Sequence, residues 1–135
     1  MKKFRTKRIL FYIGISMLAL LICSFFAIYI WIDLDVKKNI DIAKQKYSGT
    51  AEDVLIAYLS DTTNSPKDRS QIAIWTLGQI KSEKALPVLK ALYKDDPEGK
   101  TCYGRHNSVL CQYEIYKAIH AEEVNWWPLH QRLNK

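Results

Sequence analysis

Residues 9–32 read ILFYIGISMLALLICSFFAIYIWI, a run of 24 residues without a charged side chain. As a helix rising about 1.5 Å per residue, this run crosses the roughly 30 Å hydrocarbon layer of a bilayer with some tilt. An uncharged run of this length exceeds any face that one small domain can cover. The sequence therefore predicts a transmembrane helix rather than a buried core helix.

A cleaved signal peptide is the main alternative for this run, because a basic start precedes the apolar stretch. Cleavage needs small residues at alternate positions before the cut, and the large rings of Phe25, Phe26 and Tyr29 surround Ala27. Cys23 follows Leu-Leu-Ile rather than the small residues of a lipoprotein signal, so it is interpreted as an ordinary membrane-embedded residue. We expect an uncleaved signal anchor.

The flanking charges predict the orientation of this anchor. The first eight residues hold five basic residues and no acid, whereas Asp33 and Asp35 follow the apolar run. The positive-inside rule places the N-terminus in the cytoplasm and the C-terminal domain outside it, with Tyr29 and Trp31 at the outer interface. The expected location is the cell membrane, with the domain in a periplasm or at a cell surface. A lysine-rich tail, a short anchor and a small module are typical of bacterial proteins.

The net charge follows from the same partition of the chain. The 135 residues contain 20 Lys+Arg and 14 Asp+Glu, but five of the bases lie in the first eight residues, which leaves 15 against 14 in residues 33–135. A nearly neutral domain predicts no nucleic-acid binding. The expected organisation is a basic cytoplasmic tail (1–8), a transmembrane helix (9–32), a juxtamembrane helix or linker (33–49) and one extracytoplasmic helical domain (50–135).

Helical spacing of apolar residues predicts an all-α domain. Thr50 and the pair Ser65-Pro66 are typical N-caps, and further helices are expected over about 83–93 and 108–120. The residues expected to be buried are Val36, Ile40, Ala43, Tyr47, Val54, Leu55, Tyr58, Leu59, Ile72, Ala73, Thr76, Leu77, Ile80, Ala85, Leu86, Leu89, Leu92 and Tyr93. A C-terminal capping helix is expected to hold Asn125, Trp126, Trp127, Leu129 and Leu133.

Internal repetition predicts how these helices are arranged. A shift of 34 places the sequence VLIAY (54–58) on VLKAL (88–92), and a shift of 41 places Ile74 on Ile115 and Trp75 on Tyr116. The shifts differ by seven, which predicts an insertion within the second repeat, where Cys102 lies. Two stacked helical hairpins are expected.

Residues 77–89, LGQIKSEKALPVL, resemble the junction of HEAT-like repeats of the phycobilisome-lyase type, whose pattern is roughly L-G-x-I/L-x-D/S-x-x-A-V/L-P-x-L. The resemblance covers about residues 50–120 and implies a short α-solenoid of about two HEAT-like hairpins. Members of this group are mostly scaffolds or binding modules. Lyase activity is not implied, because no catalytic motif is matched.

Outside the cytoplasm, Cys102 and Cys111 are expected to form a disulfide bond worth about 2–3 kcal/mol. A three-ligand metal site of Cys102, His106 and Cys111 is the alternative. His120 is excluded from it, because His120 and Cys111 are nine positions apart on one expected helix and so point to opposite sides of it. An enzyme would use Cys111 with His106 and Glu114, but we expect Cys111 to lie inside a helix, where nothing activates a thiol. No phosphate loop, H-E-x-x-H or G-x-S-x-G motif occurs. We therefore expect no catalytic residues, no metal and no cofactor.

The aligned helices offer a candidate binding strip, in which an aromatic residue is flanked by polar residues on each second helix. The aromatics are expected to anchor a bound peptide on the concave surface, although Trp75 and Tyr116 can equally pack between the repeats. The strip consists of Gln71, Trp75, Gln79, Gln112, Tyr116 and His120.

The sequence thus predicts a single-pass membrane protein that binds a protein partner outside the cytoplasm as an adaptor, scaffold or inhibitor. The alternative is a structural subunit of a membrane complex, whose transmembrane helix makes the contacts. A thiol- or metal-dependent enzyme is the third hypothesis.

Overall fold

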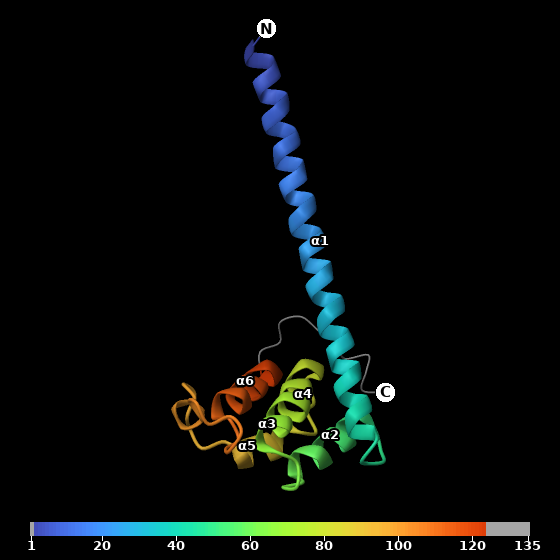
Figure 1. The fold of residues 1–135 in the computed structure, drawn as a ribbon, viewed down its shortest axis with the longest axis vertical. Helices are drawn as coiled ribbons and strands as arrows, with labels where there is room; N and C mark the ends of the chain where they lie inside the picture. The colour runs from blue at the N-terminus through green and yellow to red at the C-terminus, as the bar shows by residue number, and fades with distance from the viewer. Residues whose placement is uncertain (1, 124–135) are drawn as a thin grey trace. The chain divides into compact units, whose positions relative to one another are not determined.

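The computed structural model describes residues 2–123, which contain helices and no strands (Figure 1). The predicted capping helix with Asn125, Trp126, Trp127, Leu129 and Leu133 lies outside these residues. The chain divides into two compact units, Met1–Asp35 and Val36–Lys135. The all-α prediction is confirmed for the described part of the chain.

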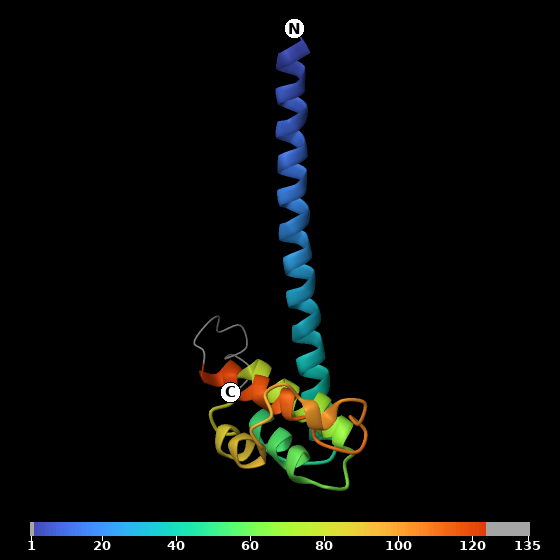
Figure 2. The same cartoon turned by 90° about the vertical axis from the view of Figure 1, so that its left-hand side faces the viewer.

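Helix α1 (Lys2–Lys44) is a single uninterrupted helix of 43 residues (Figure 2). Its segment Phe11–Lys44 contains a window with a mean hydropathy of 2.5, none of which is buried by other parts of the chain. Large apolar side chains such as Leu20 (67% exposed) and Leu21 (66% exposed) cover this part of the helix. The helix is therefore long and apolar enough to cross a membrane.

The last turns of α1 belong to the second unit and pack into its core. Val36 and Ala43 are fully buried and Ile40 is 6% exposed, as the helical spacing predicts. The side-chain amide of Asn39 donates a hydrogen bond to Thr76 Oγ1 at 3.0 Å. The narrow apolar stripe predicted after the anchor is thus part of the domain core.

A polar cluster holds the chain between α1 and the next helices. The Tyr47 hydroxyl donates to Asp61 Oδ2 at 2.5 Å, and the buried Asn64 amide donates to the carbonyl of Tyr58 at 2.9 Å. Lys46 donates to Asn64 Oδ1 at 2.5 Å, which also brings its charge to 3.8 Å from Asp61. Because of the Tyr47 hydrogen bond above all, the pKa of Asp61 falls from 3.8 to about 2.

Helix α2 (Ala51–Ser60) begins where the sequence predicts. Thr50 accepts a hydrogen bond from the backbone N–H of Asp53, whose carboxylate in turn accepts from the Thr50 backbone, so the two residues form a capping box. The four residues predicted for its buried face are all buried: Val54, Leu55, Tyr58 and Leu59.

The next expected helix is divided into three segments. Ser65 caps α3 (Pro66–Asp68), which continues as the π-helical segment η1 (Arg69–Ile74) and then as α4 (Trp75–Ile80). In the π-helical turn, the Trp75 N–H donates to the carbonyl of Ser70. Residues Ala73, Thr76, Leu77 and Ile80 are buried as predicted, whereas Ile72 is only half-buried and Ile74 is fully buried.

The last two helices begin later than the sequence predicts. Helix α5 (Leu86–Leu92) replaces the expected helix over 83–93, because Ser82 to Ala85 form a hydrogen-bonded turn and Pro87 fits only the first helical turn. Helix α6 (Gln112–Glu123) replaces the expected helix over 108–120. Ser108 and Val109 belong to a turn, in which their N–H groups donate to the Arg105 carbonyl, and the Cys111 carbonyl accepts from the Ile115 N–H at the start of α6.

The helices contact one another in pairs: α2 with η1, α5 with α6, and α4 with α6 (Figure 1). Gly78 allows the close approach of α4 to α6, because a Cβ there would lie 3.0 Å from Ala118 Cα. Ile74 and Ile115, which the 41-residue shift aligns, are both fully buried.

Candidate functional site

A small pocket lies where α4 meets α6. Ile74, Trp75 and Gln79 line it from η1 and α4, and Glu114, Lys117 and Ala118 line it from α6. Its volume is about 90 Å³. The Trp75 indole is half-buried, so it offers part of its ring to a ligand while the rest packs in the fold.

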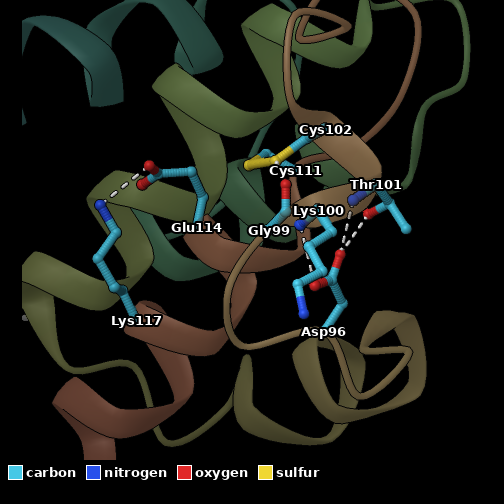
Figure 3. The surroundings of a disulfide bond; sticks show 8 residues. All are labelled: Asp96, Gly99, Lys100, Thr101, Cys102, Cys111, Glu114 and Lys117. Carbon is cyan, nitrogen blue, oxygen red and sulfur yellow. Dashed lines mark hydrogen bonds and ion pairs between the residues drawn. A yellow bond between two sulfur atoms is a disulfide. The ribbon is translucent and has the colours of Figure 1, made fainter.

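The rim of this pocket is charged on the α6 side. Lys117 Nζ lies 2.9 Å from Glu114 Oε1, and the two side chains are 46% and 29% exposed (Figure 3). Lys117 Nζ also lies 4.5 Å from the ring centre of Tyr113, a cation–π contact. Tyr113 is 44% exposed and reaches this rim through its contact with Lys117, whereas Gln79 and the Glu114–Lys117 pair line the pocket beside Trp75.

The structure does not bring the six predicted strip residues to this face. Gln71 is exposed, and Trp75 and Gln79 line the pocket. At 100° per residue along α6, Tyr116 lies 200° from Glu114, so it is on the other side of that helix.

Tyr116 belongs to a separate aromatic cluster beside α5. Its ring lies 6.2 Å from the ring of Tyr93 and 4.5 Å from the ring of His120, and its hydroxyl lies 3.2 Å from His120 Nε2. Burial is the main factor that raises the pKa of Tyr93. Tyr93 is the C-cap of α5, the helix that pairs with α6, so these contacts of Tyr116 lie within one pair of helices rather than between two pairs.

The Gln112 side chain is buried and makes its hydrogen bonds inside the fold. It is 5% exposed; its Oε1 accepts from the Lys94 N–H at 2.6 Å, and its Nε2 donates to the Leu92 carbonyl at 3.3 Å. These bonds satisfy the C-terminal end of α5. Gln112 thus fixes α6 against α5.

The second feature of interest is the loop between α5 and α6, which Cys102 and Cys111 close with a disulfide bond (Figure 3). Their Cα atoms lie 4.9 Å apart, and each residue is 2% exposed. The pairing predicted from the sequence is confirmed.

Asp96 organises the start of this loop. Its carboxylate accepts hydrogen bonds from the Lys100 N–H (3.0 Å), the Thr101 N–H (2.9 Å) and Thr101 Oγ1 (2.7 Å) (Figure 3). Both donor residues belong to the short 3-10 helix η2 (Lys100–Cys102). The Thr101 bonds are the main factors that lower the pKa of Asp96.

The expected position of Cys111 inside a helix is wrong. Helix α6 begins at Gln112, and the Ile115 N–H donates to the Cys111 carbonyl at 3.3 Å, so Cys111 is the N-cap residue. The disulfide ties this residue to the preceding loop.

The alternative metal site also has a geometric basis. Cys102, His106 and Cys111 each bring one ligand atom to within 4.8 Å of the others. His120 lies elsewhere, against Tyr116, as the nine-residue separation predicts.

Sequence reasoning missed Glu114 and Lys117 as residues that line this pocket, and it missed Tyr113, whose ring contacts Lys117. The signal was present as an acidic and a basic residue three apart on one helix, a spacing at which side chains meet. Comparisons with family models, with curated proteins and with solved structures find no match to this chain.

Proposed function

We propose that this chain is a single-pass membrane protein that binds a protein partner outside the cytoplasm, as an adaptor, scaffold or inhibitor. The observation that carries this proposal is the size and lining of the pocket between α4 and α6. At about 90 Å³ it is smaller than the 150 Å³ cavity that accepts benzene and far smaller than the 300–1,000 Å³ of a typical small-molecule site. It fits one protruding aliphatic side chain of a partner.

The lining of the pocket supports a protein as the ligand. Tryptophan and tyrosine are enriched at protein interfaces and dominate their binding energy. Here the half-buried Trp75 lines the pocket, and the exposed Tyr113 contacts Lys117 at its rim. The Glu114–Lys117 pair supplies groups that can hydrogen-bond the main chain of the partner.

The proposed architecture is a short α-solenoid of two HEAT-like hairpins. In it, α2 pairs with the α3–η1–α4 segment and α5 pairs with α6. The contacts between these helices and the repeat shifts of 34 and 41 support this assignment.

The proposed topology has residues 1–8 in the cytoplasm and the helical unit outside. The five basic residues before the apolar run and the Cys102–Cys111 disulfide support it, because disulfides persist in oxidising compartments.

Site-specific photo-cross-linking of the full chain in its own membrane tests the binding face. A benzophenone side chain is placed at Gln79, beside the pocket, and at the exposed Lys67 of α3 as the matched control. We expect a discrete cross-linked protein from position 79 that is absent from position 67. Trp75→Ala and Gln79→Arg should weaken partner capture by a folded chain, and unchanged capture by both variants would contradict the proposal.

The same assay distinguishes the alternative, in which the transmembrane helix itself makes the contacts. Residues 9–32 are exchanged for an unrelated apolar helix of equal length. A protein-binding module keeps its cross-link from position 79, whereas a subunit held through its anchor loses the partner.

A further inference from the structure

The loop between α5 and α6 brings together three side chains that can bind a soft metal ion. The sulfur atoms of Cys102 and Cys111 and one ring nitrogen of His106 all lie within 4.8 Å of one another. The two cysteines are buried and His106 is exposed, so the cluster is covered on the protein side and open to solvent on the other. Thiolate and imidazole are the ligands that Zn²⁺ prefers.

The disulfide is not the only restraint on this cluster. Asp96 fixes the chain immediately before Cys102 through its bonds to Lys100 and Thr101. Gly99 has a left-handed φ of 68° and packs closely there, because an added Cβ would lie 2.7 Å from Tyr113 Cβ. These contacts hold the backbone immediately before Cys102 independently of the disulfide.

The turns that follow return His106 to the sulfur atoms. The Arg105 N–H donates to the Cys102 carbonyl at 3.0 Å, and the Ser108 N–H donates to the Arg105 carbonyl at 2.9 Å. These bonds fold the chain back within the few residues that separate the ligands.

The last ligand lies at a favourable place for a negative charge. Cys111 is the N-cap of the 12-residue helix α6, where the unpaired N–H groups and the helix dipole favour an anion. A thiolate at Cys111 is stabilised there, as at other helix N-termini.

We propose that Cys102, His106 and Cys111 form a redox-gated zinc site, which is closed as a disulfide in the oxidised chain and binds one Zn²⁺ in the reduced chain. A dithiol oxidoreductase delivers two electrons and two protons: the Cys102–Cys111 bond breaks, two thiols form, and the dithiol becomes a disulfide. Zn²⁺ then displaces the two thiol protons and binds two thiolates and one neutral imidazole.

The geometry required for zinc is within reach of the loop. Sulfur ligands of a tetrahedral zinc ion at about 2.3 Å lie about 3.8 Å from each other, so the two sulfurs must separate by about 1.7 Å from bonding distance once the disulfide is opened. Three protein ligands leave the fourth position to water or to a group of a partner protein. Glu114 and His120 are not assigned to this position, because Glu114 forms an ion pair with Lys117 and His120 contacts the Tyr116 hydroxyl.

Spectroscopic titration of the full chain in detergent tests the site, with Co²⁺ as the probe and Zn²⁺ as the competitor. The chain carries Cys23→Ala, which removes the free thiol of α1, and is reduced anaerobically with a phosphine. We expect one Co²⁺ per reduced chain, a thiolate-to-cobalt charge-transfer band, visible bands of a tetrahedral ion, and displacement by one Zn²⁺. The oxidised chain should show none of these signals.

Matched variants assign the ligands. His106→Ala should weaken Co²⁺ binding by about tenfold or more, whereas His120→Ala should leave it unchanged. His106→Cys supplies a third thiolate and should strengthen the charge-transfer band, which tests the geometry even if the alanine variant disturbs the loop. Equal binding by the oxidised chain, no charge-transfer band in the reduced chain, or a titration insensitive to both His106 variants would overturn the proposal.

Discussion

Replacing both Cys102 and Cys111 with alanine removes the crosslink that closes the loop between α5 and α6. The two residues are nine apart, so the bond closes a ring of about ten residues. In the chain-entropy treatment, a ring of this size restricts the unfolded chain by about 2.6 kcal/mol at 25 °C. With Asp96 and Gly99 holding the native loop, most of this loss should appear in the free energy of unfolding.

Urea unfolding of the full chain in detergent, followed by tryptophan fluorescence, measures this difference. With a denaturant slope of about 1 kcal/mol/M for the helical unit, the midpoint should fall by about 2 M in Cys102→Ala/Cys111→Ala. The urea midpoint of the reduced, unmodified chain should fall by a similar amount. Cys23→Ala should leave the midpoint unchanged, because Cys23 is a free and exposed cysteine. A loss below about 0.5 kcal/mol in both the variant and the reduced chain would refute the reasoning.

Three further predictions test the junction of the helices and the polar cluster. Lys81 has a left-handed backbone (φ 50°), so Lys81→Gly should raise the free energy of unfolding by about 1 kcal/mol in the same urea assay. Gly78→Leu should lower it by about 3 kcal/mol because its Cβ meets Ala118, and Ala118→Gly in the same chain should recover part of that loss. Tyr47→Phe removes the main bond that lowers the Asp61 pKa to about 2, so that pKa should rise toward 3.8 in a carboxyl NMR titration. A lowered carboxyl pKa stabilises the fold above about pH 4, and this stability is lost as the pH falls toward 2. The free energy of unfolding should therefore fall less steeply between about pH 4 and about pH 2 in Tyr47→Phe than in the unmodified chain. An unchanged Asp61 titration would contradict this prediction.

Much of the fold follows from local sequence signals. The uncharged run of residues 9–32 specifies a long apolar helix through composition alone, and Thr50 starts α2 through its side-chain bond to Asp53. Burial of Val36, Ile40 and Ala43 follows from helical spacing, because a face with three apolar residues needs a partner surface.

The differences from prediction lie in local hydrogen bonds that the spacing of apolar residues does not report. Residues 105–109 form turns in which Ser108 and Val109 donate to the Arg105 carbonyl, and the bond from the Ile115 N–H to the Cys111 carbonyl marks the start of α6. The π-helical segment η1 changes the hydrogen-bond register of an otherwise helical pattern, and side-chain periodicity does not report that register.

The candidate site was only partly predictable, because part of it depends on bonds between residues far apart in the sequence. Trp75 and Gln79 share the pocket, since spacing along one helix fixes their common face. Gln112 has the same polar character as Gln71, but its amide bonds to the end of α5 bury it, and these bonds depend on how the second hairpin packs.

The most direct test of the membrane-anchored account is the side of the membrane on which the helical unit lies. The full chain is fused at its C-terminus either to alkaline phosphatase, which is active only outside the bacterial cytoplasm, or to a fluorescent protein that matures only inside it. The account predicts high phosphatase activity and a dark fluorescent fusion, both in the membrane fraction at the uncleaved size. Bright fluorescence with an inactive phosphatase, or a shortened fusion released from the membrane, would contradict it.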